Sequence, residues 1–272
     1  MRRALAEDIG AGDLTAALVP AGHDAHATVT TRDDAVLCGR PWFQEAFRQL
    51  DAGIAMTWHA AEGANLVAGT VLCDVRGPAR PMLTSERTGL NFLQMLSATA
   101  TAARRYVEAV AGTKARILDT RKTIPGLRAA QKYAVRIGGA DNHRLGLFDA
   151  ILVKENHIVA AGSIGAAIRE ARRLSPGVLL EVEVETLEQA AEAFAAGPDR
   201  LLLDNFSLDR LREAVSLRHE RAPTVLLEAS GGITLTNIRA IAETGVDFIS
   251  IGDMTKNIHA VDLSMRFRIS PR

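Results

Sequence analysis

RLLLDNFSLDRLREAVSLRHERAPTVLLEASGG (200–232) carries the alternation that decides the fold of this chain. An apolar run over 200–205 is followed by an amphipathic helix pattern over 207–215 and a second apolar run over 224–230. Two short buried strands joined through a helix run in the same direction, because such a crossover connects parallel neighbours. The segment therefore predicts one unit of a parallel α/β sheet.

The same rhythm continues on both sides of this segment. Further strands are predicted over 115–120, 149–154, 179–185 and 247–252, and further helices over 163–174, 186–197 and 234–245. No G-x-G-x-x-G turn opens the first unit, which argues against a dinucleotide-binding sheet. Six strands in roughly 140 residues are too few for a complete eight-stranded barrel. The C-terminal part is therefore predicted to be a small, incomplete α/β barrel.

The first hundred residues have a different pattern, typical of an α+β domain with a small sheet. Strand-like runs over 26–39, 54–60 and 65–77 surround a helical run over 41–50. A long helical region over 85–112 is predicted to connect the two domains. The tail over 258–269 alternates like an edge strand and is predicted to return to the first domain.

Composition excludes several classes of protein. The 272 residues contain 32 Lys and Arg and 32 Asp and Glu, so the net charge is zero, which argues against a general binder of nucleic acid or membrane surfaces. No apolar run approaches the ~18 residues that span a bilayer, and the N-terminus has no apolar signal region. The two cysteines, Cys38 and Cys73, are expected to be reduced, which favours a cytoplasmic protein.

Polar and charged residues follow the predicted strands. Lys154, Glu183 and Asp204 lie at or near three of these ends, and Arg121 and Lys122 follow a fourth. Because the carboxyl ends of parallel strands share one face, we expect these side chains to converge on a single mouth.

A phosphate site is predicted at the last two strands. Ser230, Gly231 and Gly232 end one strand, and Gly252 ends the next. Glycines let backbone N–H groups approach an anion, and barrels hold phosphate monoesters at adjacent last strands.

The segment 121–154 is strongly basic, with seven Lys and Arg against two Asp. Arg128, Lys132 and Arg136 are interpreted as a solvated helix face. Arg121, Lys122, Arg144 and Lys154 lie at strand ends or in a glycine-rich loop and point to a polyanionic substrate. Glu183 and Asp204 face these cations, either as Mg²⁺ ligands or as acceptors for sugar hydroxyls. A phosphoribosyl diphosphate donor satisfies all of these features.

The motifs also resemble those of the quinolinate phosphoribosyltransferase family. The resemblance rests on ILDTRKTIPGLR (117–128), KYAVRIGGADNHRLGLFDAILVKENH (132–157), EVEVETLEQ (181–189), LLLDNFS (201–207), LEASGGIT (227–234) and TGVDFISIG (244–252). It implies an N-terminal α/β open sandwich domain over 1–98, completed by 254–272, and a barrel over 99–253. It further implies a homodimer whose active site is shared between subunits, no nucleic-acid or membrane partner, and Mg²⁺ as cofactor.

The reaction implied joins quinolinate to phosphoribosyl pyrophosphate, releasing pyrophosphate and carbon dioxide in NAD biosynthesis. The quinolinate carboxylates would be held by Arg87 from the partner subunit, Arg121, His143, Arg144 and Lys154. Lys122 would bind the pyrophosphate portion, and Glu183 and Asp204 would contact the ribose hydroxyls or Mg²⁺. Ser230, Gly231, Gly232 and Gly252 would bind the 5′-phosphate. Lys122, Lys154, Glu183 and Asp204 are the expected catalytic residues.

One departure from the family pattern is Asp253, directly after the last strand, where the family usually has alanine. An acid beside a phosphate site is unexpected, and Asp253 is predicted either to point away or to pair with Lys256.

Three alternatives remain open on the sequence. A ModD-like paralogue would use the same fold with a different acceptor. A Schiff-base aldolase would use Lys154 as its nucleophile. A non-catalytic nucleotide or nucleic-acid binder would use the basic segment, although 4% aromatic residues disfavour base stacking.

Overall fold

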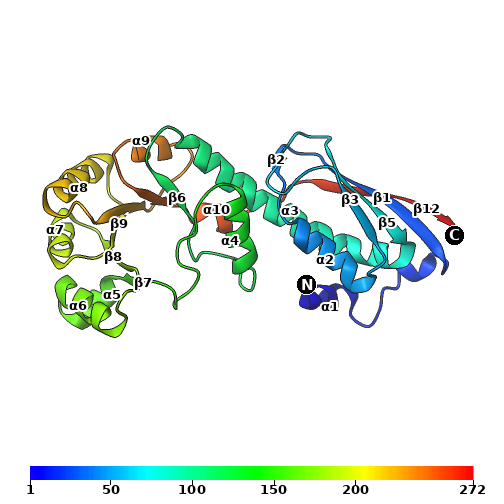
Figure 1. Cartoon of the computed structure of the whole chain (residues 1–272), viewed down its shortest axis with the longest axis horizontal. Coiled ribbons are helices and arrows are strands. Elements are labelled where there is room, and N and C mark those ends of the chain that lie inside the picture. The colour runs from blue at the N-terminus through cyan, green and yellow to red at the C-terminus, as the bar shows by residue number, and fades with distance from the viewer. Residues whose placement is uncertain (272) are drawn as a thin grey trace. The chain divides into compact units, whose positions relative to one another are not determined.

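A computed structural model describes residues 1–271, which divide into two compact units (Figure 1). Unit 1 comprises Met1–Ala102 together with the segment that begins at Ile258, and unit 2 comprises Ala103–Asn257. Helix α3 (Ala79–Ala109) contributes residues to both units.

Unit 1 is an antiparallel sheet with helices. Its elements are α1 (Arg2–Ile9), a 3₁₀ turn η1 (Ala16–Leu18), β1 (His23–Thr31), β2 (Ala35–Val36), α2 (Arg40–Leu50), β3 (Ala55–Trp58), β4 (Asn65–Leu66), β5 (Val71–Pro78), the first part of α3, and β12 (Leu263–Pro271). The main sheet has the order β12-β1-β5-β3, and β2 pairs with β4. Because β12 is an edge strand paired with β1, the prediction that the tail returns to the first domain is confirmed.

The sheet of unit 1 has one packed face. Ala25, Ala27 and Val29 alternate along β1 and are buried, while the residues between them are only half-buried. Phe43 and Phe47 of α2, with Leu90 and Leu93 of α3, pack on the same core. Gly89 permits this packing, since a Cβ at its position would lie 3.0 Å from the ring of Phe47. The other face of the sheet carries polar side chains.

Unit 2 is a six-stranded parallel sheet. Its elements are β6 (Arg116–Leu118), α4 (Arg128–Ile137), β7 (Ile151–Val153), α5 (Glu155–Ala161), α6 (Ile164–Leu174), β8 (Leu180–Val184), α7 (Leu187–Ala196), β9 (Arg200–Asp204), α8 (Leu208–Arg221), β10 (Leu226–Ser230), α9 (Ile238–Ala242), β11 (Phe248–Ser250) and α10 (Asp253–Lys256). The order β6-β11-β10-β9-β8-β7 ends at β6 on one side and at β7 on the other. The predicted incomplete α/β barrel is confirmed.

The helices of unit 2 begin where the sequence supplies a cap. Ser163, Thr186 and Ser207 precede α6, α7 and α8, and each side-chain oxygen accepts a hydrogen bond from a backbone N–H of the first turn. In Figure 1 these three helices lie along the outer side of the curved sheet. The loops from β8 to α7 and from β9 to α8 are short.

Three short helices escaped the sequence analysis: α1, α5 and α10, with eight, seven and four residues. Segments of this length span too few turns to show an apolar periodicity. Even α3, with 31 residues, is not apolar enough to cross a bilayer, and neither is any other helix within residues 1–271. Cys38 and Cys73 are both free and buried, as expected.

Candidate active site

Two cavities lie at the carboxyl ends of the strands of unit 2. One encloses about 320 Å³ and the other about 270 Å³, and they share Thr120, Lys122, Ser230 and Ser250 in their linings. The first is also lined by Arg121, His143, Arg144, Lys154, Glu183 and Asp204, and the second by Gly231, Gly232 and Gly252. Every predicted site residue except Arg87 thus lies at this mouth. Arg87 is an exposed residue of α3 in unit 1.

The cations of the mouth are largely unpaired. The side chains of Arg121 and Lys122, which follow β6, form no hydrogen bond or ion pair within residues 1–271. Arg144 donates only to the carbonyl of Ala150, at 3.3 Å. Burial lowers the pKa of Arg144, and the neighbouring positive charge of Arg121 lowers it further. Two adjacent guanidinium groups without a carboxylate partner form a receptor for a planar anion.

Two carboxylates stand opposite these cations. Glu183 of β8 accepts a hydrogen bond from the Lys154 ammonium, and Asp204 at the end of β9 accepts one from the Asn205 amide at 2.8 Å. Burial raises the pKa of Asp204, and the negative charge of Glu183 raises it further. The two carboxylates line the same cavity.

Glycine is required at the turn after β10. Gly231 has φ +96°, and a Cβ there would lie 2.9 Å from the backbone nitrogen of Asn205. Gly252 lets the Lys122 side chain cross it, because its Cβ would lie 3.0 Å from Lys122 Cδ. The backbone N–H groups of Gly231, Gly232 and Gly252 donate no hydrogen bond within residues 1–271. Three free donors beside a lysine suit a phosphate group.

A buried ion pair supports the mouth from below. Asp119, at the end of β6, accepts hydrogen bonds from Lys132 Nζ at 2.5 Å, from the Asn142 amide at 2.7 Å and from the His143 backbone N–H at 2.8 Å. Lys132 Nζ also donates to the His143 carbonyl at 3.0 Å. Asp119 and Lys132 are 0% and 1% exposed, so this network fixes the loop that carries His143 and Arg144. The interpretation of Lys132 as part of a solvated face is therefore wrong.

A second buried cluster holds the His143 ring. His143 Nε2 lies 2.7 Å from Glu181 Oε2, and Nδ1 accepts a hydrogen bond from the Arg144 backbone N–H at 2.8 Å. An Nδ1 that accepts a hydrogen bond carries no proton, so Nε2 is the nitrogen that donates to Glu181. Both ring nitrogens of His143 are therefore already engaged. Of the two buried carboxylates in this cluster, Glu228 is bound by Arg200 at 2.8 Å. Burial raises the pKa of the other, Glu181, to about 7. Burial lowers the pKa of His143, but the Glu181 and Glu228 carboxylates raise it more, to about 9.

Asp119, Lys132, Glu181, Arg200 and Glu228 were not proposed as functional residues from the sequence. One available signal was a charged residue inside a predicted buried strand, as at Glu181 in LLEVEVE and Glu228 in TVLLEAS. Such a residue is seldom buried unless it is paired. The partner of each could not be read from the sequence, because the strands that supply it are far apart along the chain.

Asp253 does not pair with Lys256. Its carboxylate accepts a hydrogen bond from the Asn257 amide and lies against the Tyr106 hydroxyl, whose pKa rises mainly through burial and then through this contact. Asp253 also occupies the first turn of α10, where a negative charge is favoured.

The comparisons with known proteins agree over almost the whole chain. Residues 13–97 match the model of the quinolinate phosphoribosyl transferase N-terminal domain, and residues 99–266 match that of the C-terminal domain. The nicotinate-nucleotide pyrophosphorylase [carboxylating] of Mycobacterium leprae is 44% identical over 97% of this chain and 95% of its own length. The human protein of the same name is 39% identical over 92% of this chain and 85% of its own length.

A solved structure shows the same similarity. The nicotinate-nucleotide pyrophosphorylase of Francisella tularensis superimposes with a TM-score of 0.94 at 47% identity, covering 98% of this chain and 94% of that chain. The resemblance drawn from the sequence motifs is thereby confirmed.

We predict that Lys132→Met destabilises the protein by about 3–5 kcal/mol, because it leaves the buried Asp119 carboxylate without its cation. The unfolding free energy in urea measures this loss. Arg136→Met is the matched control, since Arg136 is exposed on the same helix, and it should change stability by less than about 0.5 kcal/mol. Equal stability of the two variants would contradict the structural importance of the buried pair.

Proposed function

The chain belongs to the quinolinate phosphoribosyl transferase family, and on this basis we propose how its own residues carry out the reaction. It is a phosphoribosyltransferase of NAD biosynthesis. It transfers the phosphoribosyl group of phosphoribosyl pyrophosphate to quinolinate with decarboxylation, which gives nicotinate mononucleotide, pyrophosphate and carbon dioxide.

The observation that carries the assignment is the division of the mouth into three chemically distinct parts. The unpaired guanidinium groups of Arg121 and Arg144 suit the two carboxylates of quinolinate. The free N–H groups of Gly231, Gly232 and Gly252 suit the 5′-phosphate. The carboxylates of Glu183 and Asp204 line the same cavity as the two arginines, and the ribose would lie against them.

Bond cleavage at C1 of the ribose leaves positive charge on the sugar. Glu183 and Asp204 would stabilise this charge, while Lys122, which is shared by both cavities, would bind the departing pyrophosphate. Arg121 and Arg144 would hold the pyridine ring so that its nitrogen faces C1, which makes the step effectively unimolecular. Lys154, paired with Glu183 in the structure, would turn to the substrate carboxylate when quinolinate binds.

In this proposal His143 does not bind quinolinate through a ring nitrogen. Its Nδ1 accepts from the Arg144 backbone, and its Nε2 donates to Glu181. His143 would therefore position Arg144 against the substrate. Decarboxylation follows once the ring nitrogen is quaternary and can accept electrons.

Glu183 and Asp204 also fit a magnesium ion. Mg²⁺ is usually bound through one or two carboxylates together with substrate phosphates, which matches this pair. The ion would supply positive charge to the pyrophosphate as it leaves. We propose that these two residues hold it.

We also propose that the protein is a homodimer in the cytoplasm, with Arg87 acting on the site of the partner subunit. Arg87 is exposed on α3 in unit 1, whereas the other proposed substrate ligands belong to unit 2. The free, buried thiols of Cys38 and Cys73 suit a reducing compartment.

The direct test supplies the purified protein with quinolinate, phosphoribosyl pyrophosphate and Mg²⁺. We expect nicotinate mononucleotide and carbon dioxide in equal amounts, and no product when nicotinate replaces quinolinate. Chromatography and trapped carbon dioxide measure the two products. Binding of phosphoribosyl pyrophosphate without turnover of quinolinate would indicate a different acceptor, as in a paralogue.

We predict that Glu183→Gln moves the acidic limb of the pH dependence of kcat/KM to lower pH. Burial and the Glu183 charge raise the pKa of Asp204, so activity falls as pH drops through this raised value. Removing Glu183 takes away the negative neighbour and frees the Lys154 cation, and both changes favour ionised Asp204. The shift is measurable even though the rate itself falls.

Glu185→Gln is the control for the pH shift, because Glu185 is exposed just beyond the end of β8. Glu185→Gln should leave the acidic limb of kcat/KM at the same pH as in the wild-type protein. An unmoved limb in Glu183→Gln would mean that Asp204 does not control it.

We predict that Arg87→Ala and Lys154→Ala complement each other. Each variant alone should be inactive, but a heterodimer has one site built from intact residues of both chains. Random exchange of equal amounts should restore about a quarter of the wild-type rate. Exchange demonstrated by differential labelling without recovered activity would refute a shared site.

A further inference from the structure

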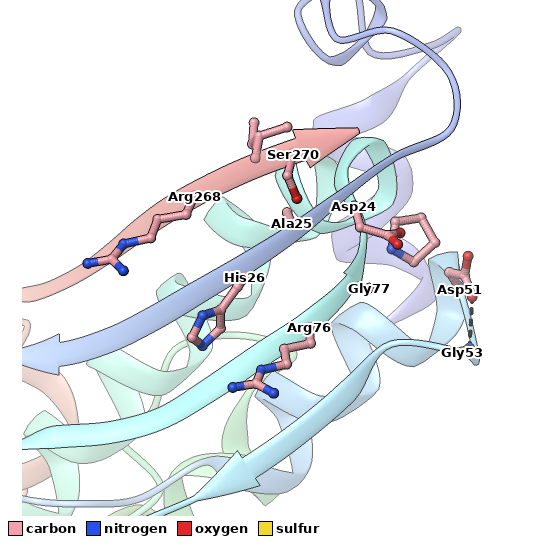
Figure 2. Close-up of a pocket in the computed structure, with 11 residues that line it drawn as sticks. Asp24, Ala25, His26, Asp51, Gly53, Arg76, Gly77, Arg268 and Ser270 are labelled. Atoms are coloured by element: carbon pink, nitrogen blue, oxygen red, sulfur yellow. Dashed lines mark hydrogen bonds between the residues drawn. The ribbon is translucent and has the colours of Figure 1, made fainter. Parts of the chain in front are cut away.

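A third cavity, of about 640 Å³, lies in unit 1 on the sheet of β12, β1, β5 and β3 (Figure 2). Six of its eleven lining residues carry polar or charged side chains: Asp24, His26, Asp51, Arg76, Arg268 and Ser270. None of these residues belongs to the mouth of unit 2. The cavity is larger than either cavity there and falls within the range of small-molecule sites.

Three basic side chains form a single row across this sheet. The register pairs His26 of β1 with Arg268 of β12 and with Arg76 of β5. Paired residues of neighbouring strands project from the same face, and Figure 2 shows the three side chains side by side. With strands about 4.8 Å apart, the backbones that carry the two arginines are separated by about 10 Å. Two guanidinium groups can reach one ligand from opposite sides of β1.

The two arginines of this row have no ion-pair partner within residues 1–271. Neither Arg76 nor Arg268 forms an ion pair or a hydrogen bond with any other residue in the 1–271 range, and both are exposed. The nearest carboxylate in the next row, Asp74, is already occupied. It accepts hydrogen bonds from His59 at 2.8 Å, from Thr28 at 2.8 Å and from His26 at 3.0 Å.

Asp74 also fixes the imidazole between the two arginines. The hydrogen bond from His26 Nε2 to Asp74 holds the ring in the row, and the contacts with His59 and Thr28 hold Asp74. These contacts keep the pKa of Asp74 low, at about 2. The His26 ring between the two arginines is thus held in place by the protein itself.

Asp24, Asp51 and Ser270 supply oxygen atoms to another part of the cavity lining. Asp24 pairs with Ser270 across the strands β1 and β12, and Asp51 lies in the turn after α2, where it accepts from the Gly53 N–H at 2.7 Å. Carboxylate and hydroxyl oxygens accept hydrogen bonds from sugar hydroxyls. The cavity therefore matches a ligand with strong negative charge at one end and hydroxyl groups at the other.

We propose that this cavity binds a nucleoside diphosphate, with its phosphates between Arg76 and Arg268 and its ribose toward Asp24 and Ser270. Arginine forks bind phosphate oxygens bidentately, and two such forks suit two linked phosphates. The proposal rests on the geometry of unit 1 alone, so it does not depend on the reaction assigned to unit 2.

The test is calorimetric titration of ADP into the full-length chain at low salt. Arg76→Ser/Arg268→Ser should weaken ADP binding by about tenfold or more, since it removes both charge-assisted contacts. The matched control is Arg266→Ser, because Arg266 is exposed on the same strand and face but lies outside the cavity lining. It should change the affinity by less than about twofold, since Arg266 does not line the cavity and makes no direct contact with a ligand there.

A third variant separates this cavity from the mouth of unit 2. Lys122→Ala/Lys154→Ala should retain ADP binding at the cavity, because both lysines lie in the other unit. Equal weakening in Arg266→Ser would indicate nonspecific attraction to a basic surface and overturn the proposal. Loss of ADP binding in the lysine variant, or unchanged binding in Arg76→Ser/Arg268→Ser, would place the ligand elsewhere and overturn it too.

Discussion

The common direction of six hydrogen-bonded strands is the constraint on which the site depends. Every strand of unit 2 is parallel to its neighbours, from β6 at one edge to β7 at the other. Parallel pairing requires a crossover after each strand, so all the carboxyl ends emerge on one face. Residues as distant in the chain as Arg121 and Gly252 therefore line adjoining cavities. No single loop could assemble so many charges around one substrate.

A mouth of this charge requires support from buried groups. The Asp119 carboxylate joins the end of β6, helix α4 and the loop that carries His143, and its pair with Lys132 is excluded from water. Glu181, Glu228 and Arg200 do the same for the His143 ring. Buried pairs of this kind add little net stability, but loss of one partner leaves an uncompensated charge. Their effect here is to hold the side chains of the mouth in one geometry, because each hydrogen bond fixes a loop atom.

The sheet of unit 1 differs from that of unit 2 in that one of its faces, and not one end of its strands, carries the charged side chains. One face of its antiparallel strands is packed against α2 and α3 through Phe43, Phe47 and Leu93. The other face carries the row of Arg76, His26 and Arg268, which antiparallel pairing aligns across three strands. Arg76 and Arg268 lie on the two strands that flank β1, and neither has a carboxylate partner within residues 1–271. Two unpaired guanidinium groups on one face are consistent with a surface that binds an anion.

The sequence by itself determined the parallel sheet, its longer helices and the predicted residues of the mouth, because hydrophobic periodicity and strand-end residues are local properties. It also identified the glycine turn after β10, because a pair of glycines at a strand end is visible in the sequence. The structure supplies the reason for glycine there: Gly231 has a positive φ and lies against Asn205. Only the tertiary structure decided that Lys132 is buried against Asp119, that Asp253 binds Asn257, and that the His143 nitrogens are occupied. These contacts join segments whose approach depends on the whole fold, and a charged residue carries no local mark of the partner it will meet.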